Sequence, residues 1–180
     1  MTAVTSVVAT SRSFDRAESR ATGPTVDAMA RQSVEQLGAL YTMGDAPRLR
    51  DLDGAPRGRM LTWVGSLGQG RAHARLTRFA RASVFPWGGK SFSSESESNG
   101  RGVNRVRLVG DAFPFATRFG PSVLDGRPCL ILDYDQPENP WAIRQIHDEL
   151  REVGRGVYLG PAMWKTWPLP KLVLFFAIET

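Results

Sequence analysis

Side chains that could do acid–base chemistry gather at the end of one strongly apolar segment. The run Cys129–Leu132 predicts a buried strand over residues 128–135. Asp133 and Asp135 follow two residues apart, so they share one face of the strand and Tyr134 lies on the other. Neighbouring carboxylates push their pKa values apart and can serve as general acid and base, and a tyrosine hydroxyl can donate to a carbonyl oxygen. The alternatives are solvated or arginine-paired carboxylates and a tyrosine at the rim of the fold.

Asn104 is a second candidate, on a strand predicted over residues 103–109. It shares a face with Val106 and Leu108, whereas Arg105 lies on the opposite face. If the apolar pair points inward, the amide of Asn104 is buried as well. An unpaired buried amide costs about 1–3 kcal/mol, so it would need a protein partner or a ligand.

Two basic residues complete the candidates for chemistry. His147 falls on the apolar face of a helix predicted over residues 140–153, where it is either a core residue or a general base. Lys90 follows the pair Gly88-Gly89 directly, and an amine there can form a Schiff base with a carbonyl compound, a role that only its position indicates. The candidate catalytic set is Asp133, Tyr134, His147 and Asn104.

Aromatic side chains are frequent on the predicted strands, and they line either the core or a pocket. Phe113, Phe115 and Phe119 alternate onto one face, which gives at least one apolar wall. Tyr158 offers another hydroxyl that can reach a carbonyl oxygen. The candidate ligand-binding residues are Trp87, Lys90, Arg105, Phe113, Phe115, Tyr158 and Trp164.

Several chemistries lack the residues that they need. The chain has one cysteine and two histidines, and no G-x-S-x-G or H-E-x-x-H motif, which argues against zinc enzymes and serine hydrolases. The segment Gly65–Gly70 lies between a strand and a helix, but it matches neither phosphate-binding glycine pattern, and a plain turn is favoured. We therefore expect neither a metal nor a cofactor.

The elements that position these residues are mostly strands. Turn signals and alternating patterns predict seven strands, at residues 59–64, 85–92, 103–109, 113–119, 128–135, 157–165 and 171–179. Short turns and few open edges favour a mostly β (α+β) fold, a small antiparallel lipocalin-like barrel of about seven or eight strands. Paired glycines inside the second strand indicate a bulge or a close backbone approach.

Three helices accompany these strands. Residues 25–43 predict an amphipathic N-terminal helix, and residues 71–82 a basic helix inserted after the first strand. The third helix begins at Asn139-Pro140, with the asparagine as cap, and stops at Gly154. Its apolar stripe consists of Ile143, Ile146, Leu150 and Val153 at helical spacing.

Composition bounds the class of protein. With 180 residues, of which 42% are hydrophobic and 23% charged, the chain can form one domain with a sizeable core, expected over residues 25–180 behind a flexible tail at residues 1–24. No apolar run approaches the roughly 20 residues of a membrane span. The single cysteine fits a reducing compartment, so we expect a cytoplasmic protein that does not enter membranes.

The charge is segregated along the chain. Residues 48–81 hold eight arginines against two aspartates, and residues 133–152 hold six acids against two arginines. These regions either face each other or face water. Nucleic-acid binding is disfavoured because no recognisable binding module and no regular alternation of aromatic and basic residues is present.

The chain resembles the Gly-x-Trp-x-Gly proteins and their companion domain of unknown function over roughly residues 50–180. The matching segments are a glycine-framed stretch at residues 54–59, WGGKSF at residues 87–92, Tyr134-Asp135, LGPAM at residues 159–163 and the apolar strand at residues 174–178. Proline stands in GAPRG where the namesake tryptophan is expected, and WGGK has one extra glycine. The resemblance implies a lipocalin-like barrel and no established activity.

These features support three hypotheses. The first is binding of a hydrophobic small molecule in the barrel, without catalysis. The second is a cofactor-independent cyclase or isomerase that holds a polyketide- or terpenoid-like substrate, as in natural product biosynthesis, and works by positioning and electrostatics. The third is an interaction domain with a filled barrel. A homo-oligomer is compatible with any of them.

Overall fold

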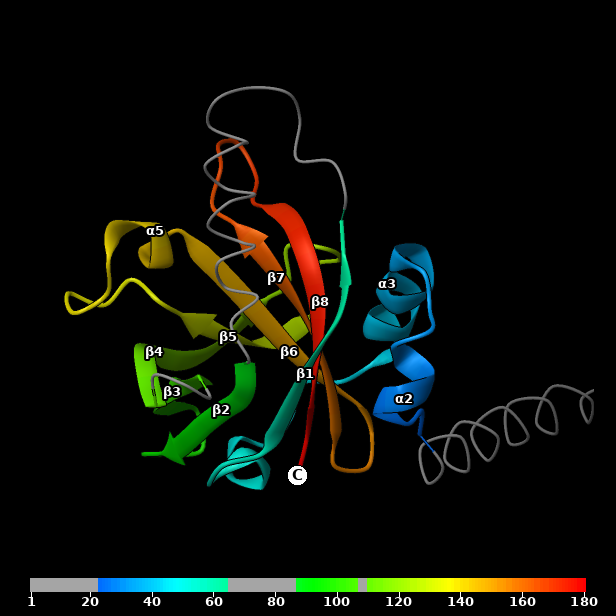
Figure 1. The fold of residues 1–180 in the computed structure, drawn as a ribbon, viewed down its shortest axis with the longest axis horizontal. Coiled ribbons are helices and arrows are strands. Elements are labelled where there is room, and N and C mark those ends of the chain that lie inside the picture. The colour runs from blue at the N-terminus through cyan, green and yellow to red at the C-terminus, as the bar shows by residue number, and fades with distance from the viewer. Residues whose placement is uncertain (1–22, 65–86, 107–109) are drawn as a thin grey trace, which may run out of the picture.

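The computed structural model describes residues 23–64, 87–106 and 110–180, which form a closed antiparallel β-barrel (Figure 1). Each strand is hydrogen-bonded to the next along the chain, and the last pairs with the first to close the ring. The strands are β1 (Arg57–Trp63), β2 (Trp87–Ser94), β3 (Asn99–Val106), β4 (Gly110–Pro121), β5 (Pro128–Asp133), β6 (Ile146–Gly154), β7 (Val157–Trp164) and β8 (Lys171–Glu179). The barrel predicted from the strand pattern is therefore confirmed, with eight strands.

The inward face of the barrel forms the main hydrophobic core. Alternate residues of each strand point inside, as the pleat requires, and those of β5 and β8 include Leu130, Leu132, Phe176 and Ile178. A short 3-10 helix, η1 (Leu49–Leu52), adds two buried leucines to this core. It precedes β1 and lies at the lower end of the barrel in Figure 1.

The N-terminal helix predicted over residues 25–43 is two helices, α2 (Val26–Met29) and α3 (Val34–Met43). The break has a local cause: Ser33 caps α3, with its side chain accepting from Gln36 N–H while the Gln36 side chain accepts from Ser33 N–H. Both helices lie on the outside of the barrel (Figure 1). They bury a second apolar cluster that includes Met29, Leu37, Tyr41, Leu159 and Phe175.

The prediction of a helix over residues 140–153 is wrong for most of that range. Only α5 (Trp141–Arg144) is helical, and residues 146–154 form β6. Asn139 does not cap α5; its side-chain amide donates to the carbonyls of Pro114 and Tyr134. The pattern misled because Ile146 and Leu150 satisfy both the helical and the strand periods.

Other observed strand boundaries differ from the predicted ones by a few residues. β2 and β3 continue into the polar loop expected at residues 93–102, which shortens it to a turn at residues 95–98. The predicted tail at residues 1–24 for the most part, and the predicted helix at residues 71–82 entirely, lie outside the described residues.

The glycine pair of β2 does mark a close backbone approach. Gly89 has a φ of +123°, and a Cβ there would lie 2.5 Å from the carbonyl oxygen of Pro56 and 2.8 Å from the amide nitrogen of Gly58. Gly89 is also the residue of β2 that pairs with Arg57 of β1. The junction between these strands therefore requires glycine at this position.

We expect Gly89→Ala to lower the free energy of unfolding by more than about 2 kcal/mol, because it adds backbone strain and a backbone clash. Gly38→Ala is the matched control, because Gly38 is in α3 and a Cβ there meets nothing within 4 Å. That change should be neutral or stabilise by up to about 1 kcal/mol. Denaturant unfolding of both variants tests this; equal stabilities would contradict it.

Candidate functional site

The amine of Lys90 lies inside the barrel and is the centre of a buried polar cluster. The residue is 3% exposed. Its Nζ donates to Asn104 Oδ1 at 2.9 Å and to Asp148 Oδ2 at 3.0 Å, and it makes a short contact with the hydroxyl of Tyr134. An ammonium, a carboxylate, a phenol and an amide thus meet at one point of an otherwise apolar interior.

These groups are also bonded to one another. Asn104 Nδ2 donates to the Tyr134 hydroxyl at 3.1 Å, and that hydroxyl lies 3.2 Å from Asp148 Oδ2. Trp87 Nε1 donates to Asn104 Oδ1 at 3.1 Å. The network therefore fixes the position of every polar head around Nζ.

Strand register brings the four elements together. Lys90 on β2 is directly opposite Asn104 on β3, and Asp148 on β6 is opposite Leu132 on β5. Tyr134 follows β5 by one residue. The cluster consequently lies toward the end of the barrel that is opposite to η1.

Aromatic rings enclose the amine. Nζ lies 5.0–5.4 Å from the ring centroids of Trp87, Phe115, Tyr134 and Phe176. Each distance is within the range of a cation–π contact, which is strongest where water is excluded. The rings thus offset part of the cost of burying a charge, while they also form an apolar wall around it.

Burial governs the electrostatics of the cluster. Desolvation lowers the pKa of Lys90 from its usual value, although the nearby charge of Asp148 opposes this shift. Burial, reinforced by the charge of Asp148, raises the pKa of Tyr134, so its hydroxyl stays protonated and remains a donor. Within the described part of the chain, the other carboxylate oxygen, Asp148 Oδ1, is buried and accepts no hydrogen bond.

One side of the cluster is less covered than the other. Trp87 and Asn104 are half-buried, whereas Tyr134 and Asp148 are 1% and 4% exposed. The same end of the barrel carries exposed apolar side chains, namely Trp141 before β6 and Trp167 between β7 and β8. The side of Trp87 and Asn104 is therefore the more accessible side of the cluster.

The structure brings together five residues that were predicted for the site: Trp87, Lys90, Asn104, Phe115 and Tyr134. Phe113 packs against the same core. Asp148 was missed because the helix predicted over residues 140–153 leaves it outside the apolar stripe. The signal that could have found it is the alternation of Ile146, Asp148 and Leu150, which is the inward face of β6.

The other predicted site residues lie elsewhere. Asp133 and His147 face each other across β5 and β6 on the outside of the barrel, where Lys165 pairs with Asp133 and Glu149 with His147. The side chain of Arg105 donates to the carbonyl oxygens of Ala55 and Pro56.

Tyr158 and Trp164 do not join the cluster either. Tyr158 is buried in the core and lies opposite Ile178, near the end of the barrel where η1 lies. Trp164 packs edge-on against Trp141, with ring centroids 6.3 Å apart. Asp135 is exposed and pairs with Arg144 at 2.6 Å, so it and Asp133 form no inward pair.

The pKa of Asp133 reflects this outer position. Partial burial works to raise it, but the backbone N–H of Asp135 and the charge of Lys165 outweigh that effect and hold the pKa below its usual value. A carboxylate that stays ionised at neutral pH fits a structural ion pair.

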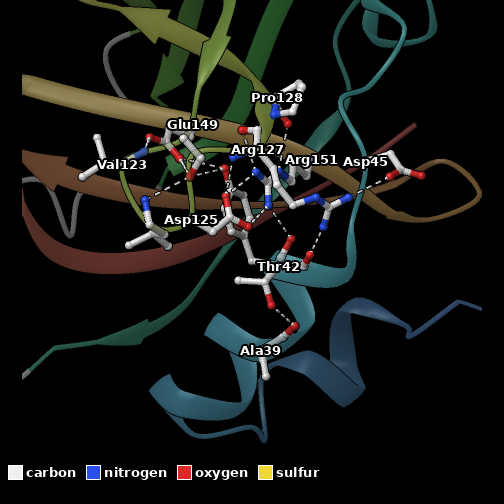
Figure 2. Close-up of polar contacts among 12 residues, drawn as sticks. Ala39, Thr42, Asp45, Val123, Asp125, Arg127, Pro128, Glu149 and Arg151 are labelled. Atoms are coloured by element: carbon white, nitrogen blue, oxygen red, sulfur yellow. Dashed lines mark hydrogen bonds and ion pairs between the residues drawn. The ribbon is translucent and has the colours of Figure 1, made fainter.

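The outer face of β6 carries a second polar network, which holds α3 and the loop after β4 on the barrel (Figure 2). Glu149 is fully buried and accepts from Ser122 Oγ at 2.5 Å, from Tyr41 Oη at 2.7 Å and from Val123 N–H at 2.7 Å. Burial works to raise the pKa of Glu149, but its hydrogen bonds, first that with His147, outweigh burial and lower it.

Arg151 is the cation of this outer network. It is fully buried and binds both oxygens of Asp125 at 2.7 Å, and it also donates to the carbonyl oxygens of Arg127 and Pro128 (Figure 2). Its guanidinium lies 4.5 Å from the ring centroid of Tyr41. Each of these groups is satisfied within the protein, which is typical of a structural network.

Among residues 23–64, 87–106 and 110–180, no group of three or more His, Cys, Asp or Glu side chains is arranged to hold a metal ion. None of the helices in these ranges combines the length and the apolar character that a membrane crossing needs.

Comparisons with known proteins assign no family to the chain. No family model and no curated protein matches the chain. A crystal structure of a protein from Thermomonospora curvata is similar over 82% of this chain and 87% of that one, at 17% identity and a TM-score of 0.48. The barrel implied by the resemblance to the Gly-x-Trp-x-Gly proteins is present, and no family is assigned.

The pairing of Lys90 with Asp148 gives a stability prediction. Lys90→Met should lower the free energy of unfolding by about 3–5 kcal/mol, because it leaves a buried carboxylate without its cation. Adding Asp148→Asn should recover part of that loss, with a coupling energy of about 0.5–3 kcal/mol. Denaturant unfolding of both singles and the double variant measures it, and strictly additive losses would contradict it.

The outer network gives a pH prediction. Since the folded pKa of Glu149 is lowered, its contribution to stability is complete above the unfolded pKa of about 4.3 and is lost as the pH falls through the folded value. Glu149→Gln should therefore cost about 1.5–3 kcal/mol at pH 7 and less on acidification.

The control for that experiment is Glu138→Gln, the same change at an exposed position. It should leave stability within about 0.5 kcal/mol of the parent. Denaturant unfolding at a series of pH values between roughly 3 and 7 gives the comparison. A loss for Glu149→Gln that stays constant across this range would show that the carboxylate's charge contributes nothing.

Proposed function

We propose that this protein binds one small, mostly apolar molecule that carries a carbonyl or hydroxyl group, with that polar group directed at Lys90. The observation that carries the proposal is the cluster of Lys90, Asn104, Tyr134 and Asp148 inside an aromatic cage. Binding sites for small molecules have this composition: apolar walls with a few convergent polar groups that fix the orientation.

The cost of the cluster supports a role beyond stability. Replacing a buried ion pair by packed apolar residues is often neutral or stabilising. By this rule, leucine or methionine at positions 90 and 148 would often leave a barrel of this kind as stable as the ion pair does. The unpaired Oδ1 of Asp148 adds to the cost, since a buried acceptor normally has a partner.

The shape of the barrel fits one ligand of modest size. Eight strands enclose an interior that is filled by side chains or holds a single small molecule. The leucines of η1 belong to the core at one end, and the half-buried Trp87 and Asn104 belong to the other. The exposed Trp141 and Trp167 at that end give an apolar molecule favourable contacts on its way in.

A cofactor-independent isomerase or cyclase is the second candidate. It is favoured by the pairing of a protonated phenol, Tyr134, with a carboxylate, Asp148, at 3.2 Å. The phenol can donate to a carbonyl oxygen while the free Oδ1 takes a proton from the adjacent carbon. The test is whether the protein turns over a bound carbonyl compound. Turnover by the parent that is lost in a folded Asp148→Asn variant would show catalysis and not only binding.

Decanol, decanal and decane form a probe series for the binding proposal. Calorimetric titration should show saturable binding of decanol and decanal to the full chain, and weaker binding of decane. Asn104→Leu should weaken decanol binding by up to about tenfold, because it removes one hydrogen bond to the ligand's oxygen. Asn99→Leu makes the same change at an exposed position on the same strand and should have no effect. Failure of all three compounds to bind the folded parent would overturn the proposal.

A further inference from the structure

We propose that Lys90 binds its ligand covalently, as a Schiff base between its Nζ and the carbonyl carbon of an aldehyde or ketone. This inference rests on the proposed function, because it places the ligand in the same part of the barrel. It goes further in naming the reacting atom, the bond and the chemical class of ligand.

The position of Lys90 sets it apart from the other lysines. The chain has three lysines, all in the described ranges; Lys165 keeps 34% of its side chain exposed, and Lys171 is exposed. Lys90 alone places its amine inside the barrel, against a carboxylate at 3.0 Å. Desolvation lowers its pKa, which increases the fraction of the neutral, nucleophilic amine.

Lysine at this position is itself informative. If the protein needed only a cation to neutralise Asp148, arginine would hold a carboxylate in a fixed bidentate geometry and would be no nucleophile. The outer face of β6, the strand that carries Asp148, shows that alternative, since Arg151 there binds both oxygens of Asp125. On the inner face, Asp148 is instead paired with Lys90 of β2, whose amine can condense with a carbonyl group.

The partners of Nζ are the groups that such a condensation needs. Asp148 takes one proton from the ammonium, which frees the lone pair of Nζ to attack the carbonyl carbon. Asn104 Nδ2 and the Tyr134 hydroxyl, 3.1 Å apart, are donors that can hold the carbonyl oxygen. Tyr134 stays protonated because burial raises its pKa, so it can pass a proton to that oxygen.

The atoms and charges of the step balance. The C–N bond forms as the C=O π bond opens and the oxygen takes the proton of Tyr134; the attacking nitrogen then gives up a proton, which restores the phenol and leaves a carbinolamine. The carbinolamine hydroxyl takes the proton held by Asp148 and leaves as water. The nitrogen lone pair closes the C=N bond. In sum, an ammonium and a carbonyl compound give an iminium and one water, with no oxidant or reductant. Asp148 is again a carboxylate at the end and faces the iminium as its counterion.

The aromatic cage suits the product as well as the free amine. The rings of Trp87, Phe115 and Phe176 surround Nζ at 5.0–5.4 Å, and they would face the iminium charge as they face the ammonium. Because the total charge of the site does not change, the condensation adds no uncompensated charge to the interior.

Reductive trapping tests the inference. The full chain is incubated with decanal and sodium borohydride, and intact mass and peptide mapping follow the product. We expect one decyl group per chain, on Lys90, and competition by excess decanol. Lys165→Arg should leave trapping unchanged, and Lys90→Arg, which keeps the positive charge, should abolish it. Asp148→Asn should slow trapping at least tenfold and shift its pH profile, because the amine loses its proton acceptor.

Binding of decanal and decanol is measured by calorimetry in parallel. If both bind and borohydride traps nothing on Lys90, the Schiff base is overturned and the binding proposal stands. If neither decanal nor decanol binds, both the Schiff base and the binding proposal are overturned. Trapping spread over Lys90, Lys165 and Lys171, or persisting in Lys90→Arg, would overturn a dedicated site.

Discussion

An ion pair inside a closed barrel is the constraint on which the rest of this structure depends. Lys90 and Asp148 come from β2 and β6, and their contact needs both strands in register with their neighbours. A register slip of one residue in β2 would turn Lys90 outward, and the same slip in β6 would turn Asp148 outward. Either slip would leave the remaining charge buried without its partner, which costs several kcal/mol. The inner polar cluster therefore makes the native register strongly favoured.

Strand β6 connects this inner cluster to an outer one. Its residues alternate, so that Asp148 and Leu150 face the interior while Glu149 and Arg151 face α3 and the loop after β4. The outer contacts tie β6 to elements far away in sequence, from Tyr41 to Asp125. They hold the strand whose inner face presents Asp148, so the outer network supports the geometry of the inner polar cluster.

The same strand marks where sequence reasoning failed. The barrel, most of its strands and the inward aromatic wall follow from alternation and turn signals, and Lys90, Asn104 and Tyr134 stood out as polar groups beside apolar strand positions. β6 did not, because its inward face carries the charged Asp148 between Ile146 and Leu150, and those two apolar residues also fit a helical period. The pairing of Asp148 with Lys90 of a distant strand is a tertiary fact that local periodicity cannot contain. With β6 interpreted as a helix, Asp148 fell outside its apolar stripe and the partner of Lys90 was missed.

The charges of the interior also limit what it can hold. Among the buried residues that the structure describes, Lys90 and Asp148 are the charged ones on the inner face, and together they are neutral. A ligand with a carboxylate would add a second negative charge, and Lys90 is already paired. The cost of burying that charge would not be compensated. A neutral carbonyl or hydroxyl group adds only a dipole, which Asn104 and Tyr134 can satisfy by donating hydrogen bonds. If the proposed ligand site is present, we therefore expect it to favour neutral, weakly polar molecules over fatty acids and other anions of the same size.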